Sequence, residues 1–279
     1  MRLFCATVLI LGLAMPTEAQ EDRGWSFAGS LSGSANSTGV VTKLDPVLGY
    51  SFNKHFSMYG GVPFYFVNSS STTTSTGTPT SGESTRGIGN TFAGLRAAID
   101  TDAVNYSSNL EFTAPTGDES KGFSTGNVTV DWTNHFSRTF SSLTPFVSAG
   151  IANTVSDTAF FIRPFTSDGV VGHFEGGAMY DATNTVRLAA SAYAVRGSGE
   201  QRLRSRVVRG GSGVSGGRDR VFETGPDIIT QSDAVNDHGF STWLSVSPKP
   251  QVNFHTGYSR SVNYDYNSVF FGIGFRIGQ

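Results

Sequence analysis

The sequence predicts an all-β protein, a single antiparallel transmembrane β-barrel of about twelve strands with up-and-down topology. Three observations support this prediction. Apolar and polar residues alternate with a period of two over twelve segments. The connections between those segments alternate between short and long along the chain. The 279 residues contain no run of about eighteen apolar residues, so no helix is expected to span a bilayer.

The twelve expected strands follow one another from residue 25 to residue 278. The first, 25–34, places Trp25, Phe27 and Leu31 on one face and serines on the other. The last, 268–278, carries an apolar residue at every second position from Val269 to Ile277. The other ten strands are expected at residues 41–52, 56–67, 90–100, 104–114, 127–136, 142–152, 170–180, 186–196, 240–248 and 252–260.

The expected connections fall into two groups. Short turns are expected near residues 53–55, 100–103, 136–141, 181–185 and 248–251. The connections that alternate with them are longer at 68–89, 115–126, 153–169 and 197–239, and turn-like at 35–40 and 261–267. Short turns at one rim, long loops at the other and both chain ends at the short-turn rim are typical of outer-membrane barrels.

The first nineteen residues have the pattern of a secretory signal peptide, which leaves residues 20–279 for the barrel. Arg2 precedes an apolar run from Leu3 to Met15, and Ala19 ends a cleavage site of small residues. A buried amino-terminal helix is the alternative. The single cysteine, Cys5, lies in this segment, so the mature chain would have no disulfide. With the barrel, these features predict an outer-membrane location in a Gram-negative type of bacterium.

Composition excludes other classes of protein. The chain is 38% hydrophobic and 12% aromatic, which is too apolar for a disordered chain. Its formal charge of −2 lacks the basic surplus of a nucleic-acid binder, so no nucleic-acid partner is expected. The sequence contains no metal-ligand spacing, phosphate loop or nucleophile elbow. We therefore expect no catalytic residues, no metal and no cofactor.

Charged residues within the expected strands share one face, except Arg196 and Arg260 at strand ends toward the long loops. An outward charge near the bilayer midplane costs roughly 2–4 kcal/mol, so this face is expected to line the lumen. The lumen-lining candidates are Lys43, Asp45, Arg96, Glu111, Asp131, His173, Glu175, Arg187, His255 and Arg276. Such groups select solutes in a narrow bore, and neutralising Arg96 and Arg187 should shift ion preference toward cations. Alternatively, the opposite charges neutralise one another in a filled lumen, because twelve strands lie between filled and open barrels.

The connection 197–239 is unusually rich in arginine. Its six arginines are spaced by glycine and serine, and they are Arg202, Arg204, Arg206, Arg209, Arg218 and Arg220. One interpretation is a loop that folds inward as a constriction. The others are a loop that binds lipopolysaccharide phosphates through guanidinium groups, and a mobile solvated loop.

Two short motifs lie near the middle of the chain. Gly87, Gly89 and Asn90 open one expected strand, and Pro115, Thr116, Gly117 and Asp118 follow the next, before a loop that contains Gly122, Thr125 and Gly126. With these motifs the chain resembles the bacterial outer-membrane transporters of the phenol-degradation meta-pathway family, which usually have Asp at the position of Asn90. The resemblance implies an exported barrel linked to the passage of small organic, often aromatic, compounds. In purely physical terms the second motif is a turn: proline ends a strand, glycine permits positive φ and aspartate bonds the backbone.

Together these features predict a non-enzymatic outer-membrane barrel for passive diffusion or uptake of small organic solutes, aromatic ones among them. Its expected partners are outer-membrane lipid, lipopolysaccharide, the outer-membrane assembly machinery and the solute. Because alternation alone does not distinguish lipid from a protein core, a secreted soluble β-protein that binds glycans or surfaces is an alternative. A filled structural barrel is another. A barrel phospholipase is disfavoured, since His255 and Ser259 lack the expected His-x-Ser-Asn spacing.

Overall fold

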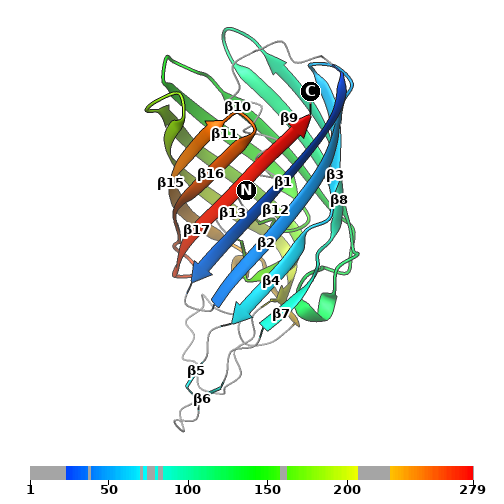
Figure 1. Ribbon diagram of the computed structural model, residues 1–279. Coiled ribbons are helices and arrows are strands. Elements are labelled where there is room, and N and C mark those ends of the chain that lie inside the picture. The colour runs from blue at the N-terminus through cyan, green and yellow to red at the C-terminus, as the bar shows by residue number, and fades with distance from the viewer. Residues whose placement is uncertain are drawn as a thin grey trace.

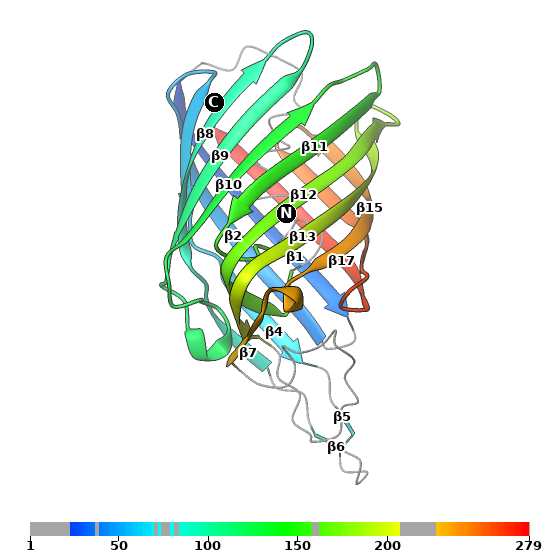
Figure 2. The ribbon, with the colours of Figure 1, turned by 180° about the vertical axis from the view of Figure 1, so that it is seen from behind.

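The described part of the chain forms a closed antiparallel sheet (Figures 1 and 2). The computed structural model describes residues 23–36, 39–69, 72–73, 79–80, 84–157, 162–206 and 227–278. The sheet closes because β1 (Gly24–Asn36) pairs with its sequence neighbour β2 (Gly39–Ser51) and with the last strand, β17 (Tyr266–Gly278). The up-and-down order of the remaining strands confirms the predicted twelve-stranded barrel. The expected signal peptide, 1–19, lies outside the described residues.

Twelve wall positions are filled by fourteen of the strands. Between β2 and β17 these are β3 (Phe56–Gly61), β4 (Phe64–Ser69), β7 (Ser84–Ile88), β8 (Thr91–Asp100), β9 (Asn105–Ala114), β10 (Thr129–Ser137), β11 (Leu143–Ala152), β12 (Phe165–Asp181), β13 (Val186–Ser205), β15 (Asp237–Lys249) and β16 (Val252–Ser261). β3 and β4 share one wall position, and β7 and β8 share the next. Pro63, which has no amide hydrogen, interrupts the predicted strand 56–67, and its carbonyl accepts from Gly89 N at 2.7 Å.

Several strands extend beyond their predicted ends at the long-loop rim. β12 begins at 165 and β13 ends at 205, so the loops expected at 153–169 and 197–239 are shorter. β4 and β7 likewise shorten the loop expected at 68–89. β14 (Asp227–Gln231) pairs with the end of β13, and β5 (Thr72–Thr73) pairs with β6 (Pro79–Thr80) in a separate sheet. The alternation signal fades in these extensions because outward residues such as Glu200 and Arg202 are polar instead of apolar.

Side chains divide sharply between the two faces of the wall. Outward residues are apolar and exposed, including Leu48 at 51%, Leu95 at 55% and Phe174 at 52%. Their neighbours in sequence point inward and are largely polar. An exposed apolar outer wall with every strand paired satisfies the bilayer's requirement that no backbone polar group faces lipid. The closed sheet and this wall place the protein in an outer membrane and set aside the soluble alternative.

Aromatic side chains gather outside the barrel at the short-turn rim. The ring centroids of Trp25 and Tyr50 lie 4.9 Å apart, and those of Tyr50 and Phe52 lie 5.2 Å apart. Tyr106 and Phe136 form a similar pair at 4.9 Å. Such amphipathic rings are typical of the girdle at a membrane interface.

Helical structure in the described residues is limited to short turns. η1 (Glu119–Lys121) and η3 (Ser232–Ala234) are 3-10 turns of three residues each. Within the ranges that the structure describes, no helix has the length and apolar character needed to cross a membrane.

Candidate functional site

All ten ionisable residues singled out in the sequence lie on the interior face of the barrel. Strand alternation places them there, because their immediate neighbours carry the exposed apolar side chains. Lys43 and Asp45, two residues apart on β2, form an ion pair of 2.9 Å with both side chains under a tenth exposed. Arg187 donates to Asp181 at 2.5 Å near the short-turn rim.

A glycine allows two of these residues to meet across a strand. His173 on β12 and Thr133 on β10 both lie opposite Gly150 of the intervening β11. A β-carbon at Gly150 would overlap the His173 ring, so its absence lets the ring reach Asp131 at 3.2 Å. Asp131 also accepts from Thr133 Oγ1 at 2.6 Å and from Ser156 Oγ at 3.3 Å.

This cluster does not have the geometry of a catalytic triad. A triad uses one imidazole nitrogen for the nucleophile and the other for the carboxylate. Here the Nε2 atom of His173 faces both Asp131 and Thr133. The cluster is therefore a polar contact between wall strands.

The remaining interior positions differ in their partners. Glu111 accepts from Tyr59 Oη at 2.8 Å, and Tyr59 Oη accepts from Asn109 at 2.7 Å. His255 lies against Gly272 and has its ring 6.2 Å from that of Phe270. Three further interior positions are Glu175, Arg96 and Arg276.

A chain of polar contacts crosses the lumen near the long-loop rim. It consists of Tyr65, Asp157, Arg163, Arg206 and Asp237, which we call the lumen bridge. Tyr65 Oη donates to Asp157 Oδ2 at 2.9 Å, and the Arg163 amide donates to Asp157 Oδ1 at 2.9 Å. Arg206 Nη1 donates to Asp157 Oδ1 at 3.1 Å and to the Arg163 carbonyl at 2.7 Å. Arg163 Nη1 lies 3.5 Å from Asp237 Oδ2.

The bridge joins nearly opposite walls of the barrel. Tyr65 is on β4 and Asp237 begins β15, with four wall positions between them on one path and six on the other. Asp237 also accepts from Tyr193 Oη at 2.9 Å and from Ser261 Oγ at 2.7 Å. The polypeptide and its ion pairs therefore narrow the bore at this level.

Electrostatics keeps the bridge charged. Burial raises the pKa of Asp157. The positive charges of Arg206 and Lys43, together with its hydrogen bonds, lower the pKa by more than burial raises it, so the net value lies below the ordinary 3.8. Burial lowers the pKa of Arg206, whereas Asp157 and Tyr65 raise it, and the net shift is upward. The carboxylate and the guanidinium are therefore both ionised at neutral pH.

The glycines of the first motif, Gly87 and Gly89, make room for the aromatic part of the bridge. Tyr65 stacks on Phe123 with centroids 5.5 Å apart and planes at 6°, and the Arg206 guanidinium lies 4.4 Å from the Tyr65 ring centroid. A β-carbon at Gly87 would come within 2.7 Å of Phe123, and one at Gly89 within 2.5 Å of Tyr65. Glycine is required at both positions by this close approach.

Hydrogen bonds join the second motif, and with it the loop that follows, to the residues of the first motif. Thr116 Oγ1 accepts from Thr91 N at 2.8 Å and donates to the Gly89 carbonyl at 3.2 Å. Gly117 N donates to the Asn90 side chain at 3.3 Å. Pro115 precedes these residues, and Asp118 caps η1 by accepting from Ser120 N at 2.9 Å. The two motifs therefore contact each other and hold the loop that carries Phe123.

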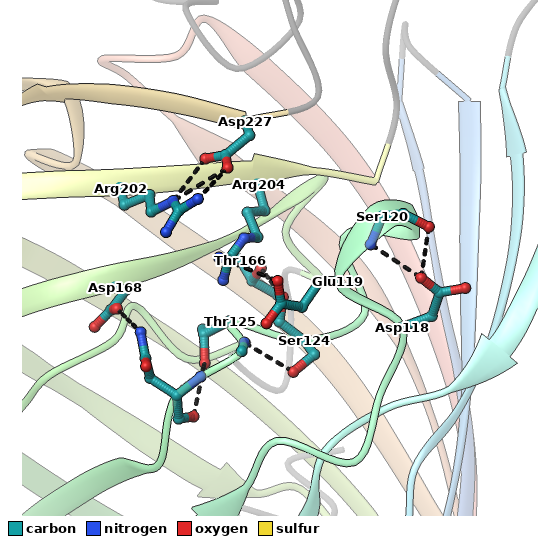
Figure 3. A network of polar contacts seen from close by, with 12 residues as sticks. Asp118, Glu119, Ser120, Ser124, Thr125, Thr166, Asp168, Arg202, Arg204 and Asp227 are labelled. Carbon is teal, nitrogen blue, oxygen red and sulfur yellow. Dashed lines mark hydrogen bonds and ion pairs between the residues drawn. The ribbon is translucent and has the colours of Figure 1, made fainter.

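The arginines of the 197–239 connection have different surroundings (Figure 3). Arg202 pairs with Asp227 in water, with both side chains more than a third exposed. Arg204 is buried and lies 3.3 Å from Glu119 of η1. Arg206, 4% exposed, belongs to the bridge and also donates to the Gly122 carbonyl at 3.0 Å. Arg204 and Arg206 are therefore buried, whereas Arg202 is exposed to solvent. Arg209, Arg218 and Arg220 lie outside the described residues.

Sequence reasoning missed most of the bridge. Tyr65, Asp157, Arg163 and Asp237 come from three separate parts of the chain and follow no motif. A usable signal was the spacing of glycines at 87 and 89, since paired small residues beside a strand often accommodate large rings.

Comparison with solved structures agrees with this architecture. The chain superposes on the COG4313 outer membrane channel from Pseudomonas putida F1 with a TM-score of 0.57 and 11% identity, over 95% of this chain and 99% of that chain. The NanC porin gives a TM-score of 0.50 and 9% identity, over 90% of this chain and all of that one. The chain has the fold of outer-membrane channels. At these identities the likeness concerns the fold alone, and the sequence matches no protein-family model and no curated protein.

Proposed function

We propose that the protein is a passive outer-membrane channel for small organic solutes, and that it selects them by bore width and interior charge. The observation that carries this proposal is the lumen bridge inside a closed barrel with a charged interior face. The bridge restricts passage to small molecules, while the interior charges give the remaining path a polar lining.

The solute class rests on the family resemblance. The motifs that resemble those of the phenol-degradation meta-pathway transporters are Gly87 and Gly89, with Asn90 where Asp is usual, and the turn from Pro115 to Asp118. In this structure they support the Tyr65–Phe123 stack at the level of the bridge. We therefore infer that small aromatic compounds are among the solutes. The motif residues act by positioning the bridge.

Lipid, lipopolysaccharide and the outer-membrane assembly machinery complete the proposed partners, and no enzymatic activity is proposed. The Asp131, Thr133 and His173 cluster lacks triad geometry. His255 points into the barrel, away from acyl chains. Both observations favour transport over lipid hydrolysis.

Solute flux into liposomes tests the proposal. Refolded barrel should admit nicotinamide, a small neutral aromatic, well above the lipid background and should exclude the trisaccharide raffinose. Folding is checked by the faster migration of the unheated barrel on a denaturing gel. If the folded barrel admits nicotinamide only at the background rate, the channel proposal is wrong and the protein is a filled structural barrel. If raffinose enters equally fast, the bridge does not limit the bore.

A further inference from the structure

Two interior arginines differ from the other cations of the barrel. Arg96 on β8 and Arg276 on β17 both lie in the half toward the short-turn rim. Their outward neighbours are strongly exposed, with Leu95 at 55% and Ile277 at 68%, which fixes the arginine side chains on the interior face. Both arginines are only partly exposed.

These two guanidinium groups have no carboxylate partner. Lys43, Arg163, Arg187 and Arg206 each pair with an aspartate. Within the part of the chain that the structure describes, neither Arg96 nor Arg276 forms an ion pair. The Arg96 Nε atom has no hydrogen-bond partner there either.

The interior carboxylates nearest in the wall are engaged elsewhere. Glu111 is held by Tyr59 at 2.8 Å, and Asp131 is held by Thr133 and His173. Asp181 is paired with Arg187. The exposed Asp100, at the end of β8, acts on Arg96 only through its electrostatic field. Among the described interior cations of this half, these two arginines therefore form no direct ion pair.

The wall between the arginines carries several small side chains, together with the larger Val47 of β2 and Tyr59 of β3. Ala28 on β1 lies opposite Arg276, and Ser57 on β3 lies opposite Arg96. Between them, Ser26 lies against Gly49 of β2, where a β-carbon would come within 2.7 Å of the serine hydroxyl. Arg276 is one of the charges whose field reaches Arg96, and the two like charges repel each other. A bound anion relieves such repulsion, and planar guanidinium forks match the two oxygens of a carboxylate.

We propose that Arg96 and Arg276 form a binding subsite for the carboxylate of a small organic anion inside the barrel. The subsite deepens the proposed function and rests on it, because it names the solute charge that this half of the bore prefers. From the sequence alone, Arg96 and Arg187 are the two arginines expected to set the ion preference. The structure assigns Arg276 instead, since Arg187 already has Asp181 as its partner.

Nicotinate and nicotinamide form a matched pair of probes, because they share the ring and differ in charge. With full-length refolded barrel in liposomes at pH 7.5, the double variant R96Q/R276Q should reduce nicotinate flux about tenfold and leave nicotinamide flux within about twofold. R96K/R276K should keep the anion preference of the reversal potential while losing part of the nicotinate flux, because lysine keeps the charge without the fork. R202Q is the control, and it should resemble the wild type, because Arg202 is exposed and already pairs with Asp227.

A second readout does not depend on transport. Nicotinate should protect Arg96 and Arg276 from modification by phenylglyoxal, as measured by mass spectrometry, and nicotinamide should not. Equal loss of both fluxes in R96Q/R276Q, or equal modification with and without nicotinate, overturns the subsite. Background flux of both probes in the wild type, together with nicotinate protection, contradicts the proposed channel and leaves the subsite in place.

Discussion

The two halves of the barrel interior use charge in opposite ways. Toward the long-loop rim, every member of the lumen bridge has a partner, and chain segments from three connections meet inside the wall. Toward the short-turn rim, the turns are short, and Arg96 and Arg276 form no ion pair with any residue that the structure describes. Paired charges in the first half hold polypeptide across the bore, whereas unpaired charges in the second remain available to a solute. Whether an interior charge has an ion-pair partner therefore indicates whether it has a structural role or is available to bind a solute.

The largest effect is expected from removing the central cation of the bridge. R206A leaves Asp157 buried without its guanidinium, which should lower the free energy of unfolding by about 3–5 kcal/mol. Urea unfolding of the barrel in lipid vesicles measures this change. Conductance in planar bilayers should rise in the same variant, because the bore is then less obstructed.

Arg202 provides the matched control, since it lies four residues earlier and also pairs with an aspartate. Its pair is exposed to water, so R202A should cost less than about 1 kcal/mol. Equal losses of unfolding free energy in R206A and R202A would show that burial does not make the Arg206 ion pair more important for stability than the exposed Arg202 pair.

A smaller effect is expected from two glycines in the left-handed region. Gly122 has φ of 68° and Gly199 has φ of 72°. Alanine at either position costs roughly 1–2 kcal/mol for the backbone. At Gly122 the new β-carbon would also overlap the Ser205 carbonyl, whereas Gly199 has open space. G122A should therefore be the less stable variant in the same unfolding assay, and the reverse order would contradict the loop's contact with β13.

The last prediction concerns acid. Because the pKa of Asp157 lies below its ordinary 3.8, ionisation stabilises the bridge fully above about pH 3.8, and this contribution is lost as pH falls through the lowered value. Conductance should be constant from pH 7 to about pH 4.5 and should rise below pH 3.8 as the carboxylate is protonated. D157N should conduct at neutral pH as the wild type does in acid. A wild-type rise already complete at pH 5 would assign the transition to another group.

The sequence predicts the wall better than the contents of the barrel. Period-two alternation correctly orients residues such as Leu95 and Arg96, because each strand residue faces either lipid or lumen by geometry alone. The bridge depends instead on contacts between distant positions, such as Arg206 with Gly122 and Arg206 with Tyr65, which are separated by 84 and 141 residues. No local pattern encodes such meetings. The extension of β13 escaped prediction because water, not lipid, surrounds its outward side chains.

The position of the bridge has a consequence for the order of folding. Tyr65 and Asp237 approach each other only in a sheet that has curled round, and the curl is completed where β1 meets β17. Contacts between such distant segments form slowly, because the entropy of closing a long loop precedes any gain. The bridge should therefore form late and influence chiefly how slowly the finished barrel unfolds, leaving the rate of folding almost unchanged.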